Sequence, residues 1–270
     1  MSRLLLFATK DFRDSLRDNQ LYYTASLFLL VALALGYVVG SNRMPAQALP
    51  MTLLGALLFL GPLAAIVVSY NDIVGKRASG ELTVLLGLPF SRRQVVLGTF
   101  LGRFAVLGVL TAAAVVTAAV IALIVGGGLA ADLLVLALLA ALLVALAFVA
   151  IAVGISANTR NTTRAAGLAF GAFLLFVVRL WDAVPGIVNF ALAQFGARPL
   201  PVGVVDVYHN LTPQAGVRNL LAAGRPVLEL AFSSTVTGPT MGPLVGLLVL
   251  LAWIVLPVAL GYWRFDDADL

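Results

Sequence analysis

The chain contains no cysteine, and this absence excludes several kinds of site. Disulfide scaffolds, iron–sulfur clusters, cysteine zinc sites and thiol catalysis all require that residue. The single histidine argues against a histidine-centred metal cluster or catalytic triad. Gly75-Lys76 does not form a phosphate-binding P-loop, because Tyr70 and Arg77 stand where that motif needs Gly and Ser or Thr. We therefore expect no catalytic residue, no metal ligand and no ATP hydrolysis in this chain.

Charge is scarce as well. Asp, Glu, Lys and Arg make up 11% of the 270 residues, and 61% of the residues are hydrophobic. A soluble domain carries roughly 25% charged and about 45–50% apolar residues. Too little polar surface is present to cover a water-facing globule, so the composition predicts an all-α polytopic membrane protein.

Six runs with little or no charge are long enough to cross the membrane as helices, since about 20 residues span the hydrocarbon core. They cover residues 21–40, 51–70, 104–131, 133–156, 165–181 and 241–263. The third run ends at Gly126-Gly127-Gly128, where a helix should stop. Residues 183–197 are also uncharged, but this short stretch contains Pro185 and Gly186. It reads as an interfacial segment or outer hairpin and not as a seventh span.

The distribution of Lys and Arg predicts the orientation of these spans. Twelve of the 17 basic residues fall on one side of the six-span arrangement and four on the other, with Arg179 inside the fifth span. Cytoplasmic loops carry the excess of basic residues, which places both termini and residues 71–103 in the cytoplasm and residues 183–240 outside. The net charge of +5 is then topological, and nucleic acid is not an expected partner.

Residues 1–20 precede the first span and have the pattern of an amphipathic helix lying in the headgroup plane of the lipid bilayer. Asp11, Asp14 and Asp18 interrupt any apolar core that a signal peptide would need. The apolar face holds Leu5, Ala8, Phe12 and Leu16, and the polar face holds Arg3, Lys10, Arg13, Asp14 and Arg17. Residues 21–270 then form the transmembrane domain.

The predicted cytoplasmic connection contains a short helix. Leu82, Leu85 and Leu86 follow the i, i+3, i+4 spacing of an apolar helical stripe. Ser79 is a candidate N-cap, and Pro89 ends the helix because the residue before a proline avoids helical geometry. We expect this stripe to have no partner in its own chain. An ordinary interfacial loop helix is the simpler alternative.

A second helix start follows at once. Ser91 and Gln94 have the spacing of a capping box. Arg92 and Arg93 then lie in the first helical turn, where cations oppose the helix dipole. We therefore expect phosphate headgroups or acidic groups of a partner protein to hold them there.

Residues 80–102 resemble a known family at this point. The stretch from Gly80-Glu81-Leu82 through Leu88-Pro89-Phe90-Ser91-Arg92-Arg93 to Gly98 and Gly102 resembles the cytoplasmic segment of ABC transporter permeases of the type-2 exporter class, although Thr99 replaces a common Lys. The resemblance implies a multi-pass permease of a prokaryotic cell membrane that works as a dimer. It also implies a separate ATPase subunit, which holds ATP and Mg and receives a coupling helix. An extracytoplasmic accessory protein is a further partner that the class allows. The residues implied in coupling are Glu81, Leu82, Leu85, Leu86, Pro89, Arg92 and Arg93.

Within that class, residues 61–75, 165–171 and 211–220 most resemble permeases of transporters that mature nitrous-oxide reductase. The resemblance favours export of a substrate and raises the question of copper. Met44, Met51, Met241 and His209 all fall on the predicted outer side, but scattered methionines without cysteine are more typical of gap filling. An exporter for drugs or lipids and a membrane scaffold without transport remain the alternatives.

Two further features are candidates for function. GxxxG pairs let helices approach closely, and the resemblance favours the first and fifth spans as the dimer contact through Gly36, Gly40, Gly167 and Gly171. Arg179 and Asp182 can pair near the outer end of the fifth span. This pair would anchor the helix at the interface marked by Trp181, or act in gating or substrate contact. Thr212-Pro213 also predicts the start of a helix that ends before Gly224.

Overall fold

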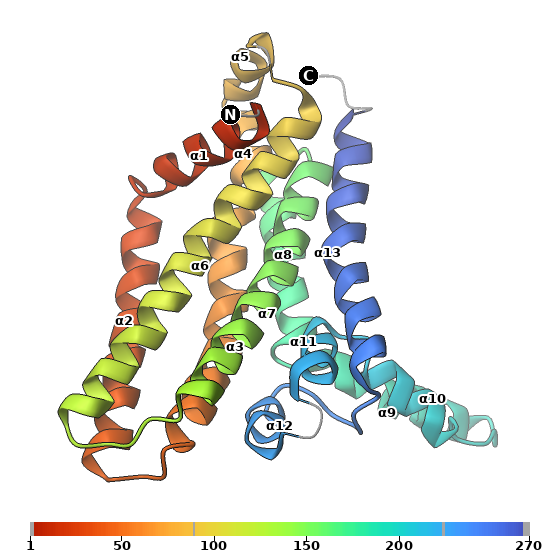
Figure 1. Ribbon diagram of the computed structural model, residues 1–270. Helices are drawn as coiled ribbons and strands as arrows, with labels where there is room; N and C mark the ends of the chain where they lie inside the picture. Colours follow the sequence, from red (N-terminus) through yellow and green to blue (C-terminus); the bar gives the residue numbers. More distant parts are fainter. Residues whose placement is uncertain (1–2, 89, 223–224, 267–270) are drawn as a thin grey trace.

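The computed structural model describes residues 3–88, 90–222 and 225–266, and these residues form helices and connecting turns without a strand (Figure 1). The long helices run roughly along one axis as a bundle (Figure 1). The long ones are α2 (Asn19–Ser41), α3 (Ala48–Ser69), α6 (Arg92–Ile124), α7 (Ala131–Asn158) and α13 (Pro243–Asp266). All five are long and apolar enough to cross a membrane.

The fifth predicted span is broken. α8 (Thr162–Phe176) and α9 (Leu180–Gln194) meet at an angle of 72° and make a sixth span only if the pair counts as one. The prediction of one continuous helix over residues 165–181 is therefore wrong. Arg179 takes a left-handed conformation, with φ of 68°, at the start of α9. α8 alone is about 22 Å long, which is shorter than the roughly 30 Å hydrocarbon core.

Several predicted helix ends are confirmed. α6 ends at Ile124, two residues before Gly126, which has a φ of 91°. The capping box at the start of α6 is complete, because the Ser91 side chain accepts from the Gln94 N–H and the Gln94 side chain accepts from the Ser91 N–H. α11 (Pro213–Val217) starts at the Thr212 cap and continues into a π-helical turn, η1 (Arg218–Ala222).

α6 is longer than predicted. Its 33 residues run without interruption from the predicted cytoplasmic connection through the third predicted span. The prediction began this span at residue 104 because Arg103 interrupts the apolar run. Arg103 is buried inside the helix instead, so α6 is a continuous rod from one end of the bundle to the other.

α7 forms the centre of the bundle and packs against both α3 and α13. Half of its buried residues are alanines, which let the neighbouring backbones approach closely. The tightest crossing is with α13, where a Cβ added to Gly261 would lie 2.7 Å from the Gly154 carbonyl oxygen. Only glycine fits there.

The two ends of the bundle differ (Figure 1). α1 (Arg3–Ser15), α4 (Asp72–Ala78), α5 (Glu81–Gly87) and the last turn of α13 lie at one end. α9, α10 (Val202–His209), α11 and α12 (Pro226–Phe232) lie at the other. This division separates residues 71–103 from residues 183–240, as predicted. That the α5 end faces the cytoplasm stays a prediction.

Candidate functional site

α5 is the short helix predicted between residues 79 and 89, but its cap differs from the prediction. Gly80 is the N-cap residue and has a φ of 76°, a left-handed conformation that favours glycine. Ser79 lies one residue earlier, and its hydroxyl accepts from the Glu81 N–H at 3.5 Å. Glu81 occupies the first turn, where its negative charge suits the helix dipole.

The expectation that the leucine stripe has no partner in its own chain is wrong. Leu82 is 1% exposed and Leu85 5% exposed, and both belong to the hydrophobic core. Leu86 is half-buried. The reason is that α5 folds back against α4, so the chain itself covers the stripe.

α5 therefore presents a different face to its surroundings. Val84 is 70% exposed and Leu88 50% exposed. Glu81, Thr83 and Gly87 are exposed beside them. Pro89, the remaining coupling candidate of this segment, lies outside the described residues.

A buried ionic network lies beneath α4 and α5. Asp11 of α1 is 2% exposed. Its carboxylate accepts a hydrogen bond from Lys76 Nζ of α4 at 3.0 Å and lies 3.2 Å from Arg103 Nε of α6. Arg103 also pairs with Asp72 at the start of α4. Because each charge has an opposite neighbour, the network offsets part of the cost of burying four ionised groups. It ties α1, α4 and α6 together.

α4 is also held by α7. The Ser156 hydroxyl of α7 accepts the N–H groups of Ile73 (3.0 Å) and Val74 (3.2 Å). Arg77 donates to the Thr159 carbonyl at 3.0 Å, just after α7 ends. The first N–H groups of a helix have no partner within the helix, so Ser156 satisfies donors of α4 that would otherwise be buried and unpaired.

Arg92 forms hydrogen bonds within its own chain. It donates to the carbonyl oxygens of Phe265 (2.6 Å) and Asp266 (2.9 Å). These carbonyls end α13 and carry the partial negative charge of a helix C-terminus. This contact accounts for a cation in the first turn of α6 without a lipid or partner protein. Arg93 is exposed, so its contact with a phosphate headgroup or an acidic group of a partner protein stays a prediction.

The two glycine pairs proposed for a dimer contact behave differently. Gly36 and Gly40 of α2 pack against α6, where an added Cβ would lie 2.5 Å from the Ala118 carbonyl oxygen and 2.7 Å from that of Ala122. The first pair therefore serves a contact within the chain, which corrects its assignment to a dimer interface. Gly167 and Gly171 of α8 are exposed and have no atom within 4 Å of an added Cβ.

Arg179 and Asp182 form the predicted pair, with Nε and Oδ2 2.8 Å apart. Thr237 joins them: its hydroxyl lies 2.7 Å from Asp182 Oδ2 and contacts the Arg179 guanidinium. Arg179 also donates to the Ser234 carbonyl. These contacts hold the α8–α9 break against residues 233–242, which supports the anchoring interpretation.

The candidate soft-metal ligands Met44, Met51, His209 and Met241 lie on separate segments of the chain. Met44 is 40% exposed, and Met51 packs against the core. His209 is 9% exposed. Among the described residues, no group of three or more His, Cys, Asp or Glu side chains is arranged to hold a metal ion.

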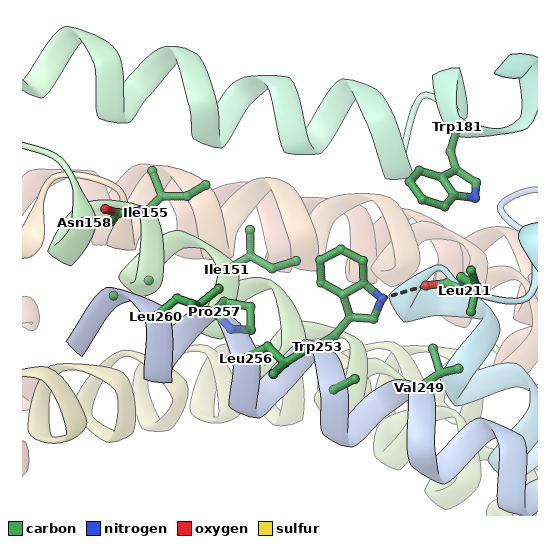
Figure 2. A pocket seen from close by; sticks show the side chains of 13 residues that line it. Ile151, Ile155, Asn158, Trp181, Leu211, Val249, Trp253, Leu256, Pro257 and Leu260 are labelled. Carbon is green, nitrogen blue, oxygen red and sulfur yellow. Dashed lines mark hydrogen bonds between the residues drawn. The ribbon is translucent and has the colours of Figure 1, made fainter. Parts of the chain in front are cut away.

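An apolar crevice of about 580 Å³ runs along α13 (Figure 2). Ile151 and Ile155 of α7 line it with Leu256 and Leu260 of α13. Asn158 lies at one end, and Trp181 and Trp253 lie at the other (Figure 2). The Trp253 indole donates to the Leu211 carbonyl at 2.6 Å.

Sequence analysis missed the ionic network of Asp11, Asp72, Lys76 and Arg103. The sequence analysis used Lys76 and Arg103 only to predict the orientation of the spans, and Asp11 only to exclude a signal peptide. The sequence contains two signals of this network. Acidic and basic residues occur together at the edges of apolar runs, and Gly98 and Gly102 of α6 leave room for another helix. α1 fills that room, since a Cβ at Gly98 would touch Phe7 and one at Gly102 would touch Asp11.

Comparison with known proteins gives consistent results. The family model described as "ABC-2 family transporter protein" matches residues 5–270. The chain is 27% identical over 280 residues to a protein of Stutzerimonas stutzeri named "Probable ABC transporter permease protein NosY", covering 98% of both chains. It is 29% identical over 218 residues to the protein of the same name in Pseudomonas aeruginosa, covering 72% of this chain and 74% of that one.

Proposed function

The chain belongs to the ABC-2 family of transporter proteins. From that premise we propose that it is a permease subunit whose transport cycle is driven by a separate ATPase, and that this ATPase docks on α5. In this family the ATPase activity lies in a separate subunit, which agrees with the lack of a P-loop in this sequence. ATP and Mg belong to that partner. The single observation that carries the proposal is the exposed face of α5.

Val84 and Leu88 are the apolar centre of this docking face. Val84 lies on α5, and Leu88 is the C-cap residue directly after it. Exposed apolar side chains on a short helix are typical of helix-in-groove recognition. Glu81 lies beside them, and Arg93 is exposed at the start of the next helix, so both suit the charged rim of such a contact. Leu82 and Leu85 support the face from beneath by packing α5 onto α4.

Movement of α5 would pass to the spans through the contacts described above. α4 is bound to α1 and α6 by the Asp11 network and to α7 by Ser156. Arg92 links the start of α6 to the end of α13. A push on α5 therefore acts on several spans at once, and the ATPase cycle shifts the balance between inward-open and outward-open arrangements.

A second copy of the chain completes the transporter. Gly167 and Gly171 lie on an exposed face of α8 and leave room for the close approach of another helix. The similarity to the Stutzerimonas stutzeri protein named NosY extends over 98% of this chain. Together with the resemblance to permeases of nitrous-oxide-reductase maturation, it supports export of a component that this maturation needs.

The docking face is tested with the double variant Val84→Ser/Leu88→Ser. Burying an exposed Val or Leu side chain contributes about 1.5–3 kcal/mol. With exposed fractions of 70% and 50%, the loss is about 2 kcal/mol, or roughly a thirtyfold weaker complex. The measurement is the affinity of the purified permease for its ATPase and the ATP turnover of the reconstituted pair.

Val204→Ser/Val207→Ser is the matched control, because these valines are 53% and 50% exposed on α10 at the opposite end of the bundle. We expect the control to bind the ATPase like the parent protein. Equal affinity of both double variants, at equal expression, would remove α5 as the docking element.

A further inference from the structure

Four arginines gather at the α4 end of the bundle around a pocket of about 510 Å³. They come from parts of the chain far apart in sequence: Arg77 from α4, Arg160 from the α7–α8 connection, Arg164 from α8 and Arg264 from α13. No Asp or Glu of the described residues lines the pocket, and none forms an ion pair with these four side chains. Four like charges around one pocket favour the binding of an anion.

Arg77 gives the clearest evidence for a bound anion. Only one of its side-chain nitrogens has a partner, the Thr159 carbonyl. Its Nε and second Nη are buried without a hydrogen bond in the described structure. Phe265 lies 5.2 Å from the guanidinium and holds the plane in place. Planar guanidinium groups match the oxygen spacing of phosphate and bind it with two parallel hydrogen bonds.

The pocket adjoins the apolar crevice along α13, because Asn158 lines both. Leu168 of α8 also lines the arginine pocket. The crevice extends along α13 from Val249 to Gly261, about 18 Å at 1.5 Å per residue. One leaflet of the hydrocarbon core is about 15 Å deep. A single site thus offers a phosphate cradle at one end and a leaflet-long apolar groove below it.

We propose that this combined pocket and crevice binds an anionic phospholipid of the leaflet at the α4 end, with the phosphate on the arginines and an acyl chain along α13. Basic pockets between transmembrane helices are typical sites for anionic headgroups. The lipid bridges α4, α8 and α13, whose direct contacts here are sparse compared with those of α7 and α13. The proposal does not depend on the docking of an ATPase.

The tryptophans that line the crevice supply a direct readout. In a Trp263→Phe background, the remaining indoles are Trp181 and Trp253, and both line the crevice. The protein is placed in phosphatidylcholine nanodiscs that contain increasing fractions of phosphatidylglycerol with brominated acyl chains, which quench nearby indoles. Brominated phosphatidylcholine serves as the uncharged comparison. We expect quenching at a lower fraction of brominated phosphatidylglycerol than of brominated phosphatidylcholine.

Arg160→Gln/Arg164→Gln tests the phosphate cradle. Both side chains are exposed, so folding should survive. Each arginine near an anionic headgroup contributes about a fivefold change in affinity, so the preference for phosphatidylglycerol should fall about tenfold or more. Arg13→Gln/Arg17→Gln removes the same charge from exposed positions at the same end and should change it less than about twofold. If the double variant does not purify, Arg264→Gln repeats the test with one charge.

Ala252→Phe tests the groove and separates a lipid from free phosphate. Ala252 lines the crevice, and a phenyl ring there should abolish preferential quenching. Ala105→Phe on the exposed side of α6 should leave it intact. Competition by millimolar inorganic phosphate as effective as that of the lipid would overturn the proposal, as would equal quenching by both brominated lipids. Loss of ATPase binding in Arg160→Gln/Arg164→Gln with an unchanged lipid preference would reassign the arginines to a protein contact.

Discussion

Asp11→Asn is the substitution that most directly probes the ionic network beneath α4 and α5. Asp11 is the carboxylate that Lys76 and Arg103 share, and all three side chains are largely buried, with exposures of 2%, 15% and 10%. Asparagine keeps the size of the side chain but removes its charge. Both cations then remain beneath α1 with one negative partner fewer.

The expected cost follows from burial. Removing one partner of a buried ion pair costs about 3–5 kcal/mol. The lower end applies here, because Arg103 retains Asp72 and Lys76 keeps some contact with solvent. We expect a loss of about 3 kcal/mol in the docking of α1 on α6, which raises the population of undocked α1 about a hundredfold.

Limited digestion with trypsin measures this population, because Lys10, Arg13 and Arg17 lie in or just after α1 and become cleavable when the helix undocks. When reclosing is faster than cleavage, the cleavage rate follows the open population. Asp14→Asn on the same helix is the matched control. Its pair with Lys10 has side-chain exposures of 52% and 44%, so its loss should cost no more than about 0.5 kcal/mol.

The two variants separate the explanations. If Asp11→Asn were digested no more than about threefold faster than Asp14→Asn, the ionic network would not hold α1. The contact between Phe7 and Gly98 would then carry the docking alone, and the proposed route from α5 to α1 and α6 would lose its physical basis.

Three further predictions concern topology, folding and association. A single cysteine at Phe195, which is 88% exposed, should react with an impermeant reagent in intact cells, whereas one at Val84 should react only after lysis; the opposite pattern would invert the orientation. Gly36→Leu should impair folding even of the monomer, because the added Cβ would lie 2.5 Å from the Ala118 carbonyl oxygen. Gly167→Leu/Gly171→Leu should leave folding intact and weaken only self-association in mild detergent, and an unchanged oligomer size would exclude this face of α8 as the dimer contact.

The location of the site was within reach of the sequence, but its exposed face was not. The spacing of Leu82, Leu85 and Leu86 correctly predicts a helix, because helical periodicity is a local property. The same stripe could be covered by another protein or by α4, and spacing alone does not distinguish the two. Val84 and Leu88 became candidates only when the position of α4 was known.

The glycine pairs likewise indicate a close helix contact without identifying the partner helix. GxxxG indicates that some helix approaches closely, and this holds for Gly36 and Gly40. The partner is α6 of the same chain, a fact that depends on how distant segments assemble. The break between α8 and α9 is similar, since Arg179 takes a left-handed conformation held by Thr237 and Ser234 from a remote loop.

The sequence alone determined that the chain is a helical membrane protein, roughly where its apolar helices lie, and several of their ends. Those features depend on hydrophobic length, on glycine and proline, and on caps formed within a few residues. The tertiary structure decided which side chains meet: the Asp11 network, the covered leucines of α5, and the arginine pocket above the crevice. Two hydrogen bonds of the Asp11 network join residues 31 and 65 positions apart, and no local pattern specifies which remote charge or surface a side chain will meet.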